Sequence, residues 1–316
     1  MNVVHITYPI SDEIRAIIPR EGQTVAIGDF DGVHLGHREV IAHAVKTALA
    51  MNCFSSVMTF HPHPREVLGL PKYSEYLTPI DRKLERFEEL GVDTCYIVTF
   101  NHVLSTLSPL QFVSEILNPL HIRHVTIGYN FTFGHLGEGN PITLRNLAAG
   151  DFSVEIIPPF QLEGQDVSST RIREALAIGD IIEANKLLGR KYAVRGTVIA
   201  GEGRGRTIGI PTANLEPIGT YVTPLNGVYA VEVTIRTGVW QGSKFSGVMN
   251  IGKKPTFHAE LSGRSWEVHL FDFADHLYGE QLIVRFKSFI RQEQKFNSVA
   301  DLLTQIQQDI QTAKKC

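Results

Sequence analysis

The sequence is poor in cysteine, with only Cys53, Cys95 and Cys316 among 316 residues. Because no two of them are closely spaced, neither a disulfide framework nor a thiolate zinc site is predicted. A reducing compartment, the cytoplasm, is therefore the expected location.

Long apolar runs are also missing. No stretch of about 18 uninterrupted apolar residues occurs, and the first residues do not combine a basic start with an apolar run. We therefore expect neither a membrane span nor secretion. An excess of positive charge is missing too, since 30 Lys and Arg face 33 Asp and Glu. No nucleic-acid partner is expected, and any anion site must be local.

The chain is long for one compact core, so two domains are the default expectation. From Thr24 to Leu188, short β-branched runs such as TVAIG and HVTIG alternate with segments of helical period. This alternation predicts an α/β domain with a parallel sheet wrapped by helices. Ligands of such sheets bind beyond the carboxyl ends of the strands, which directs attention to the loops after TVAIG and HVTIG.

After Gly189 the pattern changes to strands without long helices between them, which predicts an antiparallel β-barrel. A terminal helix is expected after Ser298, with Val299, Leu302, Leu303 and Ile306 on the face that packs. Asp180 and Gly189 have the chemistry of the N-cap and C-cap of a short helix. The predicted boundary lies near Asn185, giving domains 1–185 and 186–316.

The first candidate site follows TVAIG directly, in the segment D-F-D-G-V-H-L-G-H. Gly28, Gly32 and Gly36 would let the backbone approach a ligand closely, and amides of a first helical turn would point at it. His34 and His37 are three residues apart and can face one side of that helix. This combination favours a phosphate ligand.

Two other interpretations of this segment are open. The His pair could bind zinc, although two ligands are too few. The strand followed by D-x-D-G-V also resembles haloacid-dehalogenase-like phosphatases, in which Asp29 would be the nucleophile and Asp31 the acid/base. That resemblance leaves the following H-L-G-H unexplained.

Two further strand ends carry polar groups. In T-F-H-P-H-P, prolines should fix the loop and leave imidazoles such as that of His63 aimed outward, although a rigid turn would fit the local pattern equally well. In G-Y-N-F-T-F-G, the Asn130 amide could read a base or a sugar. Taken singly, Phe131 and Phe133 fit a hydrophobic core better than a ligand contact.

The segment V-S-S-T-R-I-R places two cations at a helix start. Ser168 or Ser169 would cap this helix, whose first turn carries Arg171 and Arg173. Cations there oppose the helix dipole, so a bound polyphosphate would compensate them. The alternative is that the arginines pair with Glu174 or other nearby carboxylates.

The second candidate site begins in G-E-G-R-G-R-T-I-G-I-P-T-A-N-L, whose dense glycines indicate a lid. Thr212 and Asn214 would lie on one side of an extended segment and could hold Mg²⁺ and phosphate oxygens. Glu267, in R-S-W-E-V-H-L-F, should face away from Trp266, Val268 and Leu270. Alternation alone fits a solvated outward residue.

With these motifs in order, the sequence resembles the bifunctional riboflavin kinase/FAD synthetase family of bacteria over nearly its full length. The motifs that carry the resemblance are G-D-F-D-G-V-H-L-G-H, T-F-H-P-H-P, G-Y-N-F-T-F-G, S-S-T-R-I-R, G-R-T-I-G-I-P-T-A-N-L, N-G-V-Y-A, M-N-I-G-K-K-P-T-F, W-E-V-H-L-F-D-F and F-I-R-Q-E-Q-K-F. The resemblance implies an N-terminal FMN adenylyltransferase of Rossmann-like nucleotidyltransferase fold and a C-terminal riboflavin kinase barrel. It also implies the substrates riboflavin, FMN and ATP, and Mg²⁺ with ATP.

The residues expected to act in catalysis are His34, His37, Arg173 and Glu267, with Thr212 and Asn214 as magnesium ligands. Those expected to bind nucleotide or flavin are Gly28, Phe30, Asp31, Gly32, Gly36, His63, Asn130, Ser169, Thr170, Arg171, Gly201, Gly205, Arg206, Gly209, Thr212, Asn214 and Arg291. The chain departs from the family pattern at Asp29, where Asn is frequent, at Ile210, where Phe is frequent, and at Lys253 and Lys254, where arginine is frequent. Lysine lacks the guanidinium fork that grips phosphate.

Two functions of other classes compete with this interpretation. A phosphatase using Asp29 and Asp31 would release phosphate without ATP. A non-enzymatic nucleotide-binding module with a nucleic-acid-binding barrel would need a basic aromatic face, against which the acidic balance argues.

Overall fold

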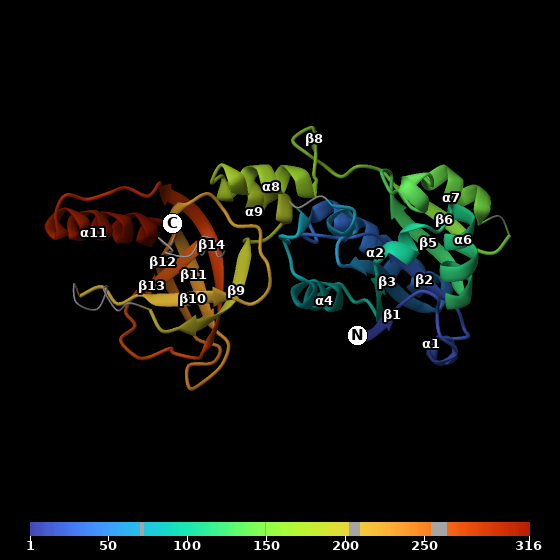
Figure 1. Cartoon of the computed structure of the whole chain (residues 1–316), viewed down its shortest axis with the longest axis horizontal. Helices are drawn as coiled ribbons and strands as arrows, with labels where there is room; N and C mark the ends of the chain where they lie inside the picture. Colours follow the sequence, from blue (N-terminus) through green and yellow to red (C-terminus); the bar gives the residue numbers. More distant parts are fainter. Residues whose placement is uncertain (70–72, 149, 202–208, 254–263) are drawn as a thin grey trace. The chain divides into compact units, whose positions relative to one another are not determined.

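The computed structural model describes residues 1–69, 73–148, 150–201, 209–253 and 264–316. Its contacts divide the chain into two compact units, Met1–Ser169 and Thr170–Cys316 (Figure 1). No helix within the described ranges is both long and apolar enough to cross a membrane.

The first unit is built on a six-stranded, fully parallel sheet in the order β1-β4-β3-β2-β5-β6. Its strands are β1 (Asn2–Ile6), β2 (Gln23–Ile27), β3 (Phe54–His61), β4 (Thr94–Thr99), β5 (Ile122–Gly128) and β6 (Ser153–Ile157). Its helices include α1 (Asp12–Ile17), α2 (Leu35–Met51), α3 (Pro64–Val67), α4 (Ile80–Glu89), α5 (His102–Ser105), α6 (Pro109–Gln111), a π-helical turn (Phe112–Leu117) and α7 (Pro141–Leu147). A small hairpin, β7 (Gln161–Leu162) and β8 (Gln165–Asp166), follows. The predicted α/β domain is confirmed.

Both faces of this sheet are covered, which explains why β2 is buried along its whole length. Val25 belongs to a core that includes Ile116 of the π-helical turn, whereas its neighbour Ala26 belongs to a core with Ile41 of α2 and Phe87 of α4. Successive strand residues point to opposite faces, so one short apolar run serves both cores.

The strand order reverses at β2, which pairs with β3 on one side and with β5 on the other. Such a reversal opens a crevice at the carboxyl ends of the two flanking strands. The loops after β2 and β5 are the two that the sequence analysis singled out. The topology therefore brings the motifs that begin at Gly28 and Gly128 to one edge of the sheet.

The second unit is a closed antiparallel barrel in the order β10-β13-β12-β11-β14-β9. Its strands are β9 (Ala193–Ile199), β10 (Ala213–Pro217), β11 (Gly227–Ile235), β12 (Lys244–Lys253), β13 (Arg264–Leu270) and β14 (Gln281–Arg291). Within the residues that the structure describes, its helices are α8 (Ser169–Ala177), which begins at the last residue of the first unit, α9 (Ile181–Leu188) and α11 (Val299–Lys315). The predicted barrel with a terminal helix is confirmed.

The predicted caps of α9 and α11 are present. Asp180 accepts a hydrogen bond from the Glu183 amide, and Gly189 ends α9 in the left-handed conformation. Ser298 likewise accepts from the Asp301 amide at the start of α11.

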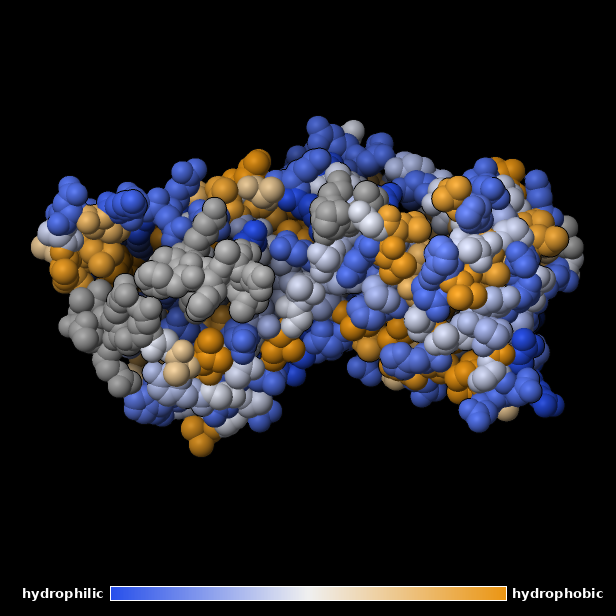
Figure 2. Space-filling view, in the orientation of Figure 1, coloured by the Kyte–Doolittle hydropathy of each residue, from blue (hydrophilic) through white to orange (hydrophobic). Residues whose placement is uncertain are grey.

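The predicted packing face of α11 is partly wrong. Val299 is 60% exposed, and the helix buries Asp309 and Ala313 instead. Ile310 packs with Ala313 against Val228 of the barrel. Figure 2 shows hydrophobic as well as hydrophilic residues on the visible surface of this helix. The buried face lies toward its C-terminal half because that half covers β11 and β12.

Helices α8 and α9 make hydrogen bonds to the part of the chain that forms the barrel. The Asn185 side-chain amide donates to the Phe286 carbonyl at 2.9 Å and its oxygen accepts from the Tyr192 amide at 2.6 Å. The Leu225 amide donates to the Leu176 carbonyl at 2.9 Å. The contacts accordingly divide the chain between Ser169 and Thr170. The domain boundary near Asn185 stays a prediction.

Candidate functional site

The turn after β2 has an unusual backbone. Phe30 and Val33 adopt positive φ angles of 54° and 40°, as does Gly32 at 91°. Such angles are strained for side chains with a Cβ, most of all for a β-branched one, and they persist where surrounding contacts determine them. Phe30 and Val33 are both buried, and a Cβ on Gly28 would lie 3.0 Å from the Phe30 ring. The absence of a side chain at Gly28 therefore allows Phe30 to lock the turn.

Asp31 holds this turn through its carboxylate. It is 3% exposed, and its two oxygens accept hydrogen bonds from the amides of Leu77 and Thr78, each at 3.1 Å. Its main-chain carbonyl accepts from the Ser169 hydroxyl at 2.8 Å. A carboxylate engaged in this way is poorly placed to exchange protons with a substrate, which argues against the phosphatase interpretation.

The two histidines of the motif lie together at the start of α2. Their rings stack with centroids 3.5 Å apart and planes 20° apart. His34 is the N-cap, and its Nδ1 accepts from the His37 amide at 3.3 Å. Both imidazoles thus gather at the positive end of a 17-residue helix. A helix N-terminus with two imidazoles is suited to an anion such as phosphate.

His63 does not point outward as the sequence analysis expected. It is 8% exposed, and its Nε2 lies 3.4 Å from Asp29 Oδ2. Its Nδ1 accepts from the Arg65 amide at 3.0 Å. The expectation was wrong because His63 caps α3 and so turns back toward the sheet edge.

The sequence analysis missed Lys83, which is 1% exposed on α4. Its ammonium donates to the Asp29 carbonyl at 2.6 Å and lies 3.9 Å from Asp29 Oδ1. A signal for it was present, because Ile80, Lys83, Leu84 and Phe87 occupy the i, i+3, i+4 and i+7 positions of a buried helix face.

His61 lies at the end of β3, where its surroundings disfavour the charged form of its imidazole. Burial lowers its pKa below 6.5, and the positive charge of Lys83 lowers it further. The imidazole can therefore accept a hydrogen bond at this sheet edge without adding a charge.

In the loop after β5, the polar residue Asn130 is exposed, whereas the aromatic residue Phe133 is buried. Asn130 is exposed, and a Cβ on Gly128 would lie 3.4 Å from its Oδ1. Phe133 is buried in the core beside Phe112 and stacks on Phe131 with centroids 5.6 Å apart. The core interpretation of Phe133 is confirmed, and Asn130 is the polar group this loop presents.

At the start of α8, the cap hydroxyls and arginines have different partners. Ser169 is the first residue of the helix, and its hydroxyl bonds to the Asp31 carbonyl rather than to the helix backbone. Arg171 lies 2.6 Å from Glu183, so its charge has a carboxylate partner, as the alternative interpretation allowed. Arg173 lies on the same helix and is half-buried. The first three residues of this helix are Ser169, Thr170 and Arg171.

The barrel aligns the second set of predicted residues in one row. Asn214 lies directly opposite Glu267, and Glu267 directly opposite Asn250. The row continues through Val228 to Arg291. Because directly opposite residues share a face of the sheet, these side chains emerge on the same outer side of the barrel.

Glu267 faces away from the barrel interior, as predicted, and it is half-buried. The Ser265 hydroxyl donates to its Oε1 at 2.7 Å. His269 Nδ1 lies 2.7 Å from the Pro211 carbonyl, which ties β13 to the residue before Thr212. The sequence analysis missed Ser265 and His269, although both share the period-two spacing of Glu267.

Gly201 and Asn214 are brought into contact. A Cβ on Gly201 would lie 1.9 Å from Asn214 Nδ2, so a larger residue there would displace that amide. Thr212 is exposed immediately before β10, and Gly209 has a φ of 78° that favours glycine. The predicted residues Gly205 and Arg206 lie outside the described residues, as do Lys254 and the side chain of Lys253.

Arg291 binds a carboxylate of the terminal helix. Its Nε and Nη2 donate to Asp309 at 2.9 and 2.8 Å, and Asp309 is 3% exposed. Such a two-pronged ion pair fixes the geometry of both partners. The guanidinium is therefore positioned at the end of the Glu267 row by α11.

The side-chain oxygens beside the Glu267 row suit a hard cation. Thr212 and Asn214 offer neutral oxygen ligands of the kind that Mg²⁺ accepts alongside water and phosphate oxygens. Among the described residues, no group of three or more His, Cys, Asp and Glu side chains could hold a metal ion.

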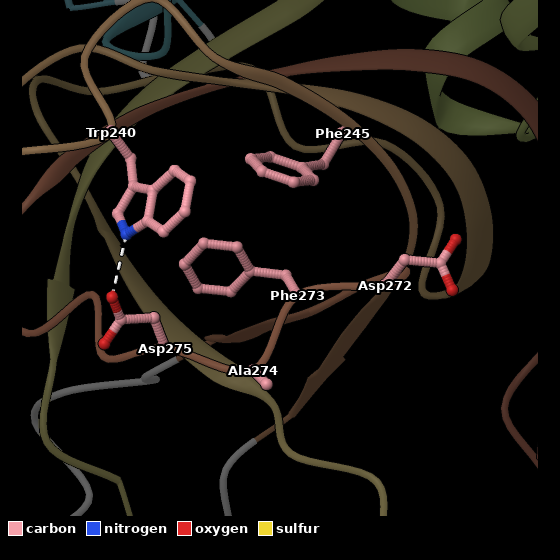
Figure 3. A pocket seen from close by; sticks show the side chains of 6 residues that line it. All are labelled: Trp240, Phe245, Asp272, Phe273, Ala274 and Asp275. Atoms are coloured by element: carbon pink, nitrogen blue, oxygen red, sulfur yellow. Dashed lines mark hydrogen bonds between the residues drawn. The ribbon is translucent and has the colours of Figure 1, made fainter.

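A separate cavity of about 430 Å³ opens elsewhere on the barrel (Figure 3). It is lined by Trp240, Phe245, Asp272, Phe273, Ala274 and Asp275. The Trp240 indole donates to Asp275 at 2.9 Å, and this hydrogen bond lowers the pKa of that carboxyl. None of the predicted site residues that the structure describes is among these six.

Both halves of the chain match known families. Residues 18–171 match the family model of FAD synthetase and residues 188–316 that of riboflavin kinase. The bifunctional riboflavin kinase/FMN adenylyltransferase of Bacillus subtilis (strain 168) is 39% identical over 318 residues, covering 99% of this chain and 97% of that protein. The protein of the same name from Escherichia coli (strain K12) is 37% identical over 302 residues, covering 94% and 93%. A crystal structure of a macrolide-efflux protein from Streptococcus pneumoniae is similar, with a TM-score of 0.89, 31% identity and 100% of each chain covered.

Proposed function

This chain belongs to the family of bifunctional riboflavin kinase/FMN adenylyltransferases and makes FMN and FAD, and from this premise we propose which residues perform each step. The observation that carries the proposal is the clustering of the motifs at two places. One is the sheet edge after β2, and the other is the row on the barrel that contains Glu267.

In the first unit, ATP phosphates would bind at the turn after β2 and the start of α2. An anionic oxygen of the FMN phosphate attacks the α-phosphorus of ATP, a new P–O bond forms, and pyrophosphate leaves. Because the nucleophile is already ionised, the protein needs no strong base. His34, His37 and the N-terminus of α2 would stabilise the charge on the phosphates. A role for Arg173 stays a prediction from the sequence.

In the second unit, the carboxylate of Glu267 would take the proton of the riboflavin 5′-hydroxyl while that oxygen attacks the γ-phosphorus of ATP. ADP leaves and FMN results. The hydrogen bond from Ser265 supports this assignment because it orients the carboxylate. Asn214, directly opposite, would contact the phosphate oxygens.

We propose Mg²⁺ as the partner of ATP in the kinase step. When bound, it would neutralise charge on the phosphates. Thr212 and Asn214 would hold it through their side-chain oxygens, and Gly201 supports this by leaving room for the Asn214 amide. The cytoplasm, as the compartment, stays a prediction from the sequence.

The test of the assignment measures both reactions on the intact chain. Purified protein is incubated with riboflavin, ATP and Mg²⁺, and the flavins are separated over time. A second reaction starts from FMN and ATP. We expect FMN and then FAD from the first reaction, and FAD with equimolar pyrophosphate from the second. Release of inorganic phosphate from FMN without ATP would support the phosphatase instead.

A further inference from the structure

Beneath the phosphate-binding turn lies a lysine with no direct place in the chemistry proposed above. Lys83 is 1% exposed, and a buried ammonium is costly unless it is paired and hydrogen-bonded. Its Nζ donates to the main-chain carbonyl of Asp29 at 2.6 Å and lies 3.4 Å from the Thr59 hydroxyl oxygen. The Thr59 hydroxyl itself donates to the same Asp29 carbonyl at 2.8 Å. Two donors from two elements thus fix one peptide group.

The position of that peptide matters because the strained turn follows it directly. Asp29 precedes Phe30, whose φ is 54°, and Val33 follows with a φ of 40°. Strained backbone of this kind needs outside contacts to persist. Lys83 supplies one from α4 at Asp29, and Asp31 supplies another through the amides of Leu77 and Thr78.

The charge of Lys83 also faces a carboxylate. Asp29 Oδ1 lies 3.9 Å from the ammonium and, within the described part of the chain, makes no hydrogen bond although it is buried. Asp29 Oδ2 accepts from the Asp31 amide at 3.2 Å and lies 3.4 Å from His63 Nε2. A carboxylate directly after β2 would repel a triphosphate unless a cation cancelled its charge. Lys83 supplies a buried positive charge 3.9 Å from this carboxylate.

We propose that Lys83 is a positioning residue of the adenylylating site, which fixes the turn after β2 through the Asp29 carbonyl and cancels the Asp29 charge beside the ATP phosphates. This inference rests on the proposed placement of those phosphates. It makes Asp29 and Lys83 one charge-balanced pair whose members have opposite effects on nucleotide affinity.

The test uses the opposite effects that Lys83→Met and Asp29→Asn should have on the KM for ATP. Lys83→Met leaves the Asp29 charge uncompensated, so the KM for ATP in FAD formation from FMN should rise by about three- to tenfold. Asp29→Asn leaves the Lys83 charge uncompensated, so the same KM should fall by about three- to tenfold. The double variant carries neither charge but still lacks the Lys83 hydrogen bond to the Asp29 carbonyl, so its KM should lie between those of the two single variants. Lys46→Met is the matched control, since it removes an exposed lysine from the same unit.

The measurement is steady-state FAD formation on the full chain at low ionic strength, with thermal unfolding as a check on folding. If Lys83 had only a structural role, both single variants would lower kcat, and neither would lower the KM for ATP. The proposal is overturned if the two single variants shift KM in the same direction, or if folded Lys83→Met stays within twofold. Should Lys83→Met not fold, Asp29→Asn decides alone: a lower KM supports the proposal and an unchanged or higher one overturns it. Absence of FAD formation by the unaltered protein would instead contradict the proposed function.

Discussion

Glu267 lies directly opposite Asn214 across the antiparallel pair β13–β10, so a carboxylate and an amide from distant segments share one face of the barrel. Ser265 donates to the carboxylate at 2.7 Å. In the function proposed above, this pair would place an oriented proton acceptor beside a phosphate ligand, as phosphoryl transfer to an alcohol requires.

Substitution of Glu267 should separate the two activities. Glu267→Gln keeps the shape but removes the base, so riboflavin phosphorylation should fall by about 10²–10⁴-fold. Formation of FAD from supplied FMN should stay unchanged. Glu232→Gln is the control, because Glu232 pairs with Lys191 on the same barrel, outside the Glu267 row. Unchanged kinase turnover in Glu267→Gln would remove this residue from the mechanism.

Substitution of His37 should have the reverse effect. Its ring stacks on that of His34 at the start of α2, so His37→Ala removes a phosphate donor and the support of the other imidazole. We expect at least about a 10²-fold loss of FAD formation and full retention of riboflavin phosphorylation. His43→Ala is the control, since this half-buried histidine lies on the same helix and binds Glu155. Equal loss of both activities would contradict separate sites.

Asp31 should prove structural. In Asp31→Asn one side-chain acceptor becomes a donor that faces a backbone amide, so the first unit should lose about 1–3 kcal/mol of unfolding free energy. Urea unfolding followed by circular dichroism measures this loss. Asp12→Asn, in the first turn of α1, is the control. A variant as stable as the unaltered protein would mean that the bonds to Leu77 and Thr78 contribute little.

The three cysteines should differ in reactivity. Burial raises the pKa of the Cys95 thiol to about 12, so almost no thiolate exists at pH 8. Cys316 is exposed at the C-terminus. A thiol-specific reagent such as DTNB should modify Cys316 rapidly and Cys95 only in denaturant, and Cys316→Ser should remove the fast phase. Rapid modification of Cys95 in the folded protein would contradict its burial.

The barrel should depend on α8 and α9. Asn185 bonds to the barrel residues Tyr192 and Phe286, so a fragment that begins after it lacks both contacts. We expect residues 170–316 to unfold at a higher temperature than residues 186–316, by several degrees. Asn185→Ala in the longer fragment isolates the two hydrogen bonds. Equal melting temperatures would favour the boundary near Asn185 as the structural one.

The sequence by itself determined the class of each domain, the caps of α9 and α11, and the motifs that lie at the two sites. These features are local: strand period, helix period, turn glycines and capping side chains can be read within a few residues. Glu267 was predicted to face outward by alternation alone, and it does.

Only the tertiary structure decided which distant groups meet. Lys83 reaches Asp29 because α4 packs on one face of the sheet through Phe87, and His63 turns inward because it caps α3. Asn185 is bound to the barrel by two hydrogen bonds that no local sequence pattern predicts. A buried ammonium and a carboxylate from separate segments are stabilised by one another, so their pairing depends on how the chain folds and not on spacing in the sequence.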